Sequence, residues 1–292
     1  MVTMLNLMLR PLAWLPLAVL HAIGVPLGWL VYCCSRTYAA RLDANLKQSG
    51  LATGEAEYER LRNAAIVEAG KGIVELAAIW LLPAPRVARL IREVRNLNTI
   101  EAARRSGRGI LILTPHLGCF EITGFFFGQM MPLTVLYRPP RLRWLLPLMI
   151  KGRRRGRVDL AATDIAGVRR LFKALRAGNA AGMLPDQVPR FGEGTWANFF
   201  GRPALTMTLS NRLRQATGCA TFMAFAERLP RGAGYCLHIQ PLSDAPADEL
   251  QLNQAVEAMI RLRPEQYLWG YDRYKVPNGA AAPAINAQSA AP

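Results

Sequence analysis

The sequence predicts an α/β fold, a largely parallel sheet with helices on both faces, preceded by an N-terminal transmembrane helix. Short apolar runs at 109–114, 133–137 and 180–184 alternate with longer segments of helical periodicity. That alternation is typical of a parallel sheet covered on both faces. Residues 12–34 contain no Asp, Glu, Lys or Arg. As a helix they would extend roughly 34 Å, enough to cross a bilayer core of about 30 Å.

The apolar N-terminal segment has further features of a membrane helix. Pro16 and Pro26 would damage a water-exposed helix but are tolerated in membrane helices, and Trp14 and Trp29 lie where interfacial aromatic residues gather. A signal peptide fits less well, because the apolar stretch is too long and no small-residue cleavage site follows. A buried core helix remains the alternative. Basic residues follow the segment more than they precede it, which favours a cytoplasmic location for the rest of the chain. They are Arg36, Arg41 and Lys47.

The remaining elements follow from periodicity and from capping residues. In the first half of the chain we expect helices at 35–70, 72–82 and 86–105, a strand at 109–114, an apolar helix through Phe127 and a strand at 133–137. In the second half we expect a helix from Ile165 to Leu175, strands at 180–184, 219–228 and 235–241, and a helix at about 247–262. Asp164 can cap the first of these later helices and Gly178 can end it. The Gly-rich turn at 232–234 indicates a hairpin.

Composition restricts the partners. Lys and Arg number 36 against 20 acidic residues, giving a net charge of +16, and such a surface favours an anionic partner. The mean hydropathy, +0.11, is high for a soluble enzyme. The five cysteines show neither the spacing of a metal site nor a paired disulfide framework. Their scatter indicates a reducing compartment.

His116 is the strongest candidate for chemistry. It follows the apolar run that ends at Leu113, where a strand is expected to end and a helix to begin. Ligands of open α/β sheets bind at the carboxyl ends of the strands. An imidazole there, with Glu121 five residues later, could accept a proton from a hydroxyl while the carboxylate holds its other nitrogen. The alternative is a histidine that is simply hydrogen-bonded within a turn.

Six short blocks resemble one family, the late acyltransferases of lipid A biosynthesis within the lysophospholipid acyltransferase superfamily. The blocks are His116-x4-Glu121, Tyr137-Arg138-Pro139, Gly152-Arg153, Leu184-Pro185-Asp186-Gln187, the segment 199–204 and the segment 264–269. His-x4-Glu alone is a weak signal, but six blocks in family order are specific. The resemblance covers about residues 10–276.

The resemblance implies transfer of a fatty acyl chain from acyl carrier protein to a hydroxyl of a phosphorylated lipid A precursor. It implies His116 as general base oriented by Glu121, with no metal and no cofactor. The developing oxyanion would be stabilised by backbone amides at the helix start or by Arg153.

The resemblance also implies a substrate-binding set. Arg138 and Arg153 suit phosphate groups, since guanidinium binds phosphate bidentately. Asp186 and Gln187 belong to the same set, and Asp186 could anchor a loop, orient an arginine or contact the acceptor. The other arginines of 151–157 are assigned to anionic lipid or to the acidic carrier protein.

Three further residues, Cys119, His238 and Asp272, receive no catalytic assignment. Cys119 lies inside the histidine motif but is interpreted as a small buried hydrophobe. His238 alternates with apolar residues on a strand and is interpreted as structural. The terminal block departs from the family pattern, because Asp272 stands where members often have His or Asn, which puts a donor role at this position in doubt.

The predicted organisation is a membrane anchor at 1–34, an acyltransferase domain at 35–276 and a disordered tail at 277–292, in the inner membrane with the domain facing the cytoplasm. A same-fold enzyme acting on a lysophospholipid or an ornithine lipid is an alternative. A basic membrane-bound nucleic-acid-binding protein is disfavoured, because the basic residues lack interleaved aromatics and no recognition motif is present. No nucleic-acid partner is therefore expected.

Overall fold

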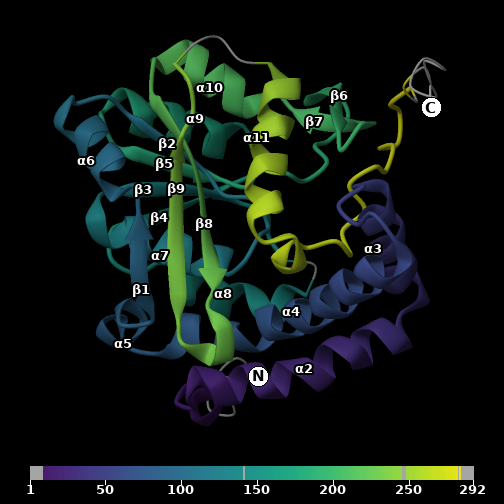
Figure 1. The fold of residues 1–292 in the computed structure, drawn as a ribbon. Helices are drawn as coiled ribbons and strands as arrows, with labels where there is room; N and C mark the ends of the chain where they lie inside the picture. The colour runs from purple at the N-terminus through teal and green to yellow at the C-terminus, as the bar shows by residue number, and fades with distance from the viewer. Residues whose placement is uncertain (1–8, 141, 245–247, 282, 284–292) are drawn as a thin grey trace.

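A seven-stranded sheet with helices on both faces forms the centre of the molecule (Figure 1). The computed structural model describes residues 9–140, 142–244, 248–281 and 283. Strand order is β1-β9-β8-β2-β5-β3-β4, and every pairing is parallel apart from the antiparallel pair β8–β9. This confirms the predicted fold class.

The strands explain the apolar runs in the sequence. Those of the main sheet are β1 (Ile91–Arg95), β2 (Ile110–Leu113), β3 (Leu133–Tyr137), β4 (Val158–Ala162), β5 (Ala180–Met183), β8 (Ala220–Arg228) and β9 (Tyr235–Pro241). Every residue of β2, β5 and β8 is buried, as expected for central strands covered on both faces. The predicted hairpin is confirmed by β8 and β9.

Helices and 3₁₀ turns surround this sheet. They are α2 (Leu17–Cys34), α3 (Arg36–Gln48), α4 (Glu55–Leu81), α5 (Ala84–Ala88), α6 (Leu97–Arg105), α7 (Phe120–Met130), η1 (Arg143–Leu145), α8 (Leu146–Arg153), α9 (Ile165–Arg176), α10 (Leu209–Thr217), η2 (Pro230–Gly232), α11 (Glu249–Leu262) and η3 (Pro264–Gln266). Helix α2 packs against α4 rather than against the strands. The predicted capping of α9 is confirmed, since the Asp164 side chain accepts a hydrogen bond from the Gly167 amide at 2.7 Å.

Several predicted boundaries were wrong. Residues 86–105 are not one helix, because β1 lies between α5 and α6 and obtains its hydrogen bonds from β9, a partner distant in sequence. Glu55–Leu81 is a single helix rather than the predicted separate helices. The structure also contains β4 and a separate hairpin of β6 (Gly194–Phe199) and β7 (Arg202–Met207), which periodicity did not reveal.

The apolar helix predicted over residues 12–34 is shorter in the structure. Helix α2 begins at Leu17, because Pro16 has extended backbone angles and precedes the first turn. Its 18 residues extend about 27 Å. By length and composition it is the one helix in the described part of the chain that could cross a membrane. One face packs against α4, and Val19, Ile23 and Leu30 on other faces are exposed.

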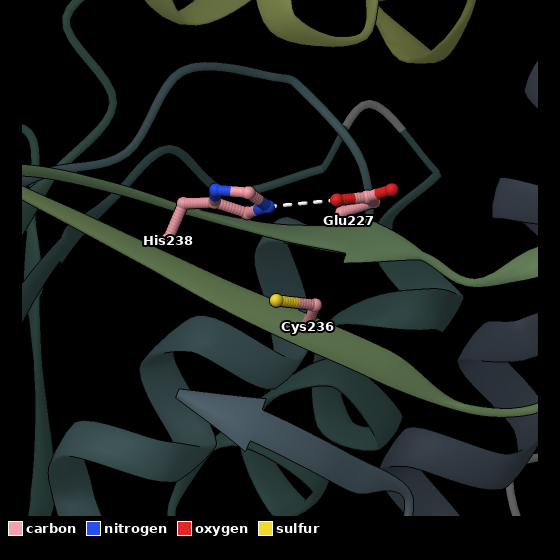
Figure 2. Close-up of side chains that lie close together, drawn as sticks. All are labelled: Glu227, Cys236 and His238. Atoms are coloured by element: carbon pink, nitrogen blue, oxygen red, sulfur yellow. Dashed lines mark hydrogen bonds and ion pairs between the residues drawn. The ribbon is translucent and has the colours of Figure 1, made fainter. Parts of the chain in front are cut away.

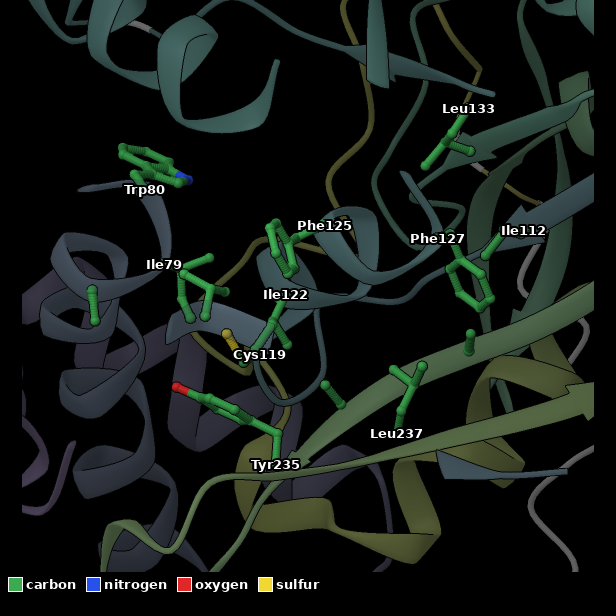
Figure 3. Packing of buried hydrophobic residues seen from close by; sticks show 14 of the residues in the cluster. Ile79, Trp80, Ile112, Cys119, Ile122, Phe125, Phe127, Leu133, Tyr235 and Leu237 are labelled. Carbon is green, nitrogen blue, oxygen red and sulfur yellow. The ribbon is translucent and has the colours of Figure 1, made fainter. Parts of the chain in front are cut away.

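Two hydrophobic cores lie on opposite faces of the sheet. In the first, side chains of α7 pack between the strands and α4, with Phe125 and Phe127 among them (Figure 3). The second includes apolar residues of α9, α11 and the segment around Trp269. Both cores fix the carboxyl ends of the central strands, where the candidate site lies. The predicted disordered tail, 277–292, falls mostly outside the described residues.

Candidate active site

His116 lies in the loop between the carboxyl end of β2 and the start of α7. The loop is fixed on several sides. The backbone amide of His116 donates to Asp186 Oδ2 at 2.9 Å, its carbonyl accepts from the Leu268 amide, and the Gly118 amide donates to the Gln266 carbonyl. This placement confirms the predicted position of His116 at a strand end. The hydrogen bonds hold the backbone that carries the imidazole.

Both ring nitrogens of His116 have polar partners. Nδ1 lies 2.8 Å from Asp186 Oδ1, and Nε2 lies 3.1 Å from the Gln187 side-chain nitrogen. A ring protonated at Nδ1 satisfies both contacts, since a carboxylate can only accept and an amide nitrogen can only donate. Burial by itself raises the pKa of Asp186, but the charge and hydrogen bonds of His116 outweigh burial and lower that pKa. Asp186 is therefore an ionised partner that leaves Nε2 as the basic nitrogen.

The predicted contact between Glu121 and the imidazole is not formed. Glu121 instead accepts hydrogen bonds from Arg153 and, at 3.0 Å, from Trp80 Nε1 of α4. The turn at Gly118, which has φ +59°, and the start of α7 separate Glu121 from the imidazole. Asp186 supplies the orienting contact that the sequence analysis assigned to Glu121.

Arg153 is also placed differently from the prediction. It is largely buried, and its guanidinium forms an ion pair with Glu121. Burial lowers the pKa of Arg153, but Glu121 outweighs burial and raises it, so the pair stays charged. Its contact with a phosphate stays a prediction, and in this structure the guanidinium already has a carboxylate partner.

Arg138 lies exposed immediately after β3 and makes no side-chain hydrogen bond or ion pair with a described residue. Burial raises the pKa of Tyr271 while the charge of Arg138 opposes that effect. The Tyr271 hydroxyl accepts a hydrogen bond from the Val188 amide, next to Gln187. Arg138 is thus a solvent-accessible cation close to the segment that carries Asp186.

The rest of the basic stretch is partly structural. Arg155 donates to the carbonyls of Ile79 and Leu82 at the end of α4, and Arg157 donates to carbonyls at the end of α7. Guanidinium groups commonly satisfy the last carbonyls of a helix in this way. Arg154 and Lys151 remain exposed.

An apolar pocket adjoins the histidine loop. It is partly open to solvent, and its cavity volume is about 70 Å³. Glu121, Arg153 and Trp80 form a polar part of its wall, and Phe120, whose ring centre lies 5.0 Å from that of His116, lines it too. The main apolar lining residues are Ile79, Ile112, Phe125, Phe127, Leu133, Val135, Leu136, Val158, Leu160, Met183 and Leu184.

Comparison with known proteins identifies the family. Residues 1–276 match the bacterial lipid A biosynthesis acyltransferase family. The chain belongs to this family. The similarity confirms the resemblance inferred from the six sequence blocks, and it extends over the pocket and the His116 loop.

Individual relatives show the extent of the similarity. The lipid A biosynthesis lauroyltransferase of Escherichia coli K12 is 28% identical over 271 residues, which cover 89% of this chain and 87% of the relative. The palmitoleoyltransferase of the same strain is 28% identical over 212 residues, covering 70% and 68%. A lipid A biosynthesis acyltransferase of Haemophilus influenzae is 25% identical over 185 residues, covering 61% and 57%.

The other candidate side chains of this acyltransferase lie away from the His116 loop or are buried. Burial raises the pKa of the Cys119 thiol well above its usual value, which does not favour a nucleophile. Asp272 forms an exposed ion pair with Arg41 at 3.1 Å.

Glu227, Cys236 and His238 lie close enough together to hold a metal ion (Figure 2). However, Glu227 already accepts hydrogen bonds from His238 at 2.7 Å and from Arg263 at 2.5 Å, and the His238 ring stacks on Phe225. These contacts agree with a structural role for His238.

The sequence analysis missed Trp80 and the pairing of Asp186 with His116. One signal for the pairing was available, because the Asp186 block follows a strand just as His116 does. Carboxyl ends of neighbouring parallel strands meet at one edge. Only the strand order shows that β5 and β2 are neighbours.

Proposed function

We propose that this acyltransferase moves a fatty acyl chain from acyl carrier protein to a hydroxyl of a phosphorylated lipid A precursor, with His116 Nε2 as general base. The observation that carries the proposal is the pairing of buried Asp186 with partly buried His116, whose ring lies beside Phe120 of the pocket wall. The Asp186 side chain is 2% exposed and that of His116 is 13% exposed. A carboxylate in this position orients the ring and stabilises the imidazolium that forms.

The proposed reaction needs no acyl-enzyme. Nε2 takes the proton of the acceptor hydroxyl as its oxygen attacks the thioester carbonyl. The carbon–sulfur bond then breaks, and the imidazolium returns the proton to the departing thiolate. The amides of Phe120 and Glu121 open α7 and have no intrahelical acceptor, so they are candidates to stabilise the oxyanion. Gln187 would leave Nε2 when the hydroxyl binds.

Glu121 and Arg153 receive a different role from the one inferred from sequence. Their ion pair, together with the Trp80 indole, closes one side of the pocket. We assign the pocket to the acyl chain and the ion pair to the wall beside the thioester. Arg138, exposed and without a partner among the described residues, is assigned to a phosphate of the acceptor.

Charge and hydropathy support the proposed donor and the proposed location. The net charge of +16 complements an acidic carrier protein and would raise the encounter rate. The exposed apolar faces of α2 and the basic residues that follow it favour the inner membrane, with the sheet on the cytoplasmic side.

The test is acyl transfer by the purified full-length protein. Acyl-carrier-protein thioester and a bis-phosphorylated precursor are supplied, and product is measured by mass spectrometry. His116→Ala should lower turnover by roughly 10²–10⁴, and Cys119→Ala should retain most of it. Near-wild-type turnover by His116→Ala would exclude the mechanism. Equal transfer to lysophospholipid or ornithine lipid would replace the proposed acceptor, and rapid hydrolysis without acceptor would indicate a thioesterase.

A further inference from the structure

A buried charge network lies directly behind the histidine loop. Arg228 at the end of β8 donates from Nη2 to Glu75 Oε1 at 2.7 Å and from Nε to Oε2 at 2.9 Å. Its Nη1 lies 3.4 Å from Glu68 Oε2. The side chains of Arg228 and Glu75 are 6% and 2% exposed. Removing one partner of such a pair leaves an unpaired buried charge, which is strongly destabilising.

Arg228 also holds the catalytic loop. Its Nη2 donates to the Gly118 carbonyl at 2.9 Å, two residues after His116. The neighbouring groups are fixed as well, since the Cys119 amide donates to the Ala226 carbonyl and the Gln266 side chain bonds the backbone of Arg228. Gly118 has φ +59°, and a Cβ there would lie 2.0 Å from the Ala226 carbonyl oxygen. The loop therefore lies against β8 in a conformation that Arg228 completes.

The N-terminal apolar helix reaches the same network. His21 of α2 is buried, and its Nε2 lies 3.5 Å from Glu75 Oε2. This is a close approach rather than a hydrogen bond, since Nε2 has no hydrogen-bond partner among the described residues. The Tyr235 hydroxyl donates to the same oxygen at 2.9 Å. Burial by itself raises the pKa of Glu75, but Arg228 and His21 outweigh burial and bring it to about 2. Glu75 thus links α2 to the guanidinium that holds the loop.

Glycines set the distance between α2 and α4. A Cβ on Gly28 would lie 2.2 Å from the Ile66 carbonyl oxygen, and a Cβ on Gly24 would lie 2.7 Å from the Lys71 backbone. A larger residue at either position must therefore move α2 away from α4. On the outer face, Ala22 is exposed.

We propose that α2 positions the catalytic loop through Glu75 and Arg228, in addition to any part it takes in membrane attachment. The packing of Gly24 and Gly28 keeps His21 beside Glu75, Glu75 orients Arg228, and Arg228 fixes the Gly118 carbonyl. The proposal rests on the proposed function only in taking His116 as the base that this loop carries. Arg228 and Glu75 are positioning residues that act through the loop.

The test compares two substitutions that each place a valine on α2. Gly28→Val pushes α2 off α4, whereas Ala22→Val enlarges the exposed face. Full-length proteins are reconstituted in phospholipid vesicles, and kcat and KM for donor and acceptor are measured with membrane sedimentation. We expect Gly28→Val to lower kcat by about tenfold to a hundredfold with KM unchanged, since a displacement of about 1 Å can cost a hundredfold in rate. Ala22→Val should stay within about twofold of wild type, a change of about 0.4 kcal/mol or less. Both should sediment with vesicles.

A second variant keeps the test decisive if Gly28→Val unfolds. Glu75→Gln conserves volume and weakens the hold on Arg228, while Glu68, 3.4 Å from Nη1, remains as a carboxylate partner for the buried guanidinium. A folded Glu75→Gln protein, checked by circular dichroism, should show the same fall in kcat at constant KM. Equal kcat for wild type, Gly28→Val and folded Glu75→Gln would overturn the proposal. A raised KM with unchanged kcat would overturn it too, because that result assigns the network to substrate binding. His116→Ala, tested in parallel, separates this outcome from failure of the proposed function.

Discussion

Replacing Asp186 by Asn tests the central geometry most directly. The substitution keeps the volume of a side chain that is almost completely buried, but it removes the charge that faces His116. Asp186 makes two contacts with that residue, at 2.8 Å to Nδ1 and at 2.9 Å to the backbone amide. The amide oxygen of Asn can still accept one of these bonds. The loss therefore falls on the ring contact and on stabilisation of the imidazolium.

The magnitude follows from these contacts. A hydrogen bond to a charged group contributes about 1.5–3 kcal/mol, which at 1.36 kcal/mol per tenfold corresponds to about 10–150 in rate. An Asn that turns its NH₂ group towards Nδ1 also favours the wrong tautomer, and the same change in a Ser-His-Asp triad costs about 10⁴. For Asp186→Asn we expect kcat to fall by about 10²–10⁴, with KM changed by less than about threefold because the carboxylate does not line the pocket.

The assay is steady-state acyl transfer at saturating donor and acceptor. Glu121→Gln provides the comparison, because Glu121 lines the pocket and does not contact the imidazole. It should alter KM for the acyl donor as well as kcat. Asp186→Asn turnover above about a tenth of wild type, or a larger kcat loss in Glu121→Gln than in Asp186→Asn, would refute the assignment of Asp186 as the orienting carboxylate.

The remaining predictions concern the acceptor, the buried network and the pocket. Arg138→Ala should lose more activity on a bis-phosphorylated acceptor than on a dephosphorylated one, and equal losses would remove the phosphate role. The pKa of Glu75 is lowered from 4.5 to about 2 in the folded protein, so its contribution to stability is present above pH about 4.5 and is lost as pH falls towards 2. That contribution is about 3 kcal/mol, and Glu75→Gln should flatten this acid dependence in denaturant titrations from pH 6 to 2.5. A Cβ on Gly124 would meet open space at the pocket. Gly124→Ala and then Gly124→Leu should shift preference progressively to shorter acyl chains in competition assays, and an unchanged preference would place the acyl chain elsewhere.

The sequence by itself determined the fold class and most central elements. The apolar runs at 109–114, 133–137 and 180–184 became β2, β3 and β5, because strands buried on both faces must be apolar along their whole length. Asp164 and Gly178 set the limits of α9, since capping depends on residues next to each other in the chain. The six blocks identified the family, and the position of His116 at a strand end followed from the local pattern alone.

Only the tertiary structure decided which side chains meet. Glu121 is five residues from His116 yet faces Arg153, while Asp186 is distant in sequence and contacts the ring, because strand order rather than chain separation determines which loops are neighbours. Strand β1 was hidden for the same reason, since its hydrogen-bond partner β9 lies far along the chain. The buried link from His21 through Glu75 and Arg228 to Gly118 joins four segments of the chain. Local periodicity carries no information about such contacts. The attraction between these charged groups becomes strong only when folding brings them together in the interior, away from water.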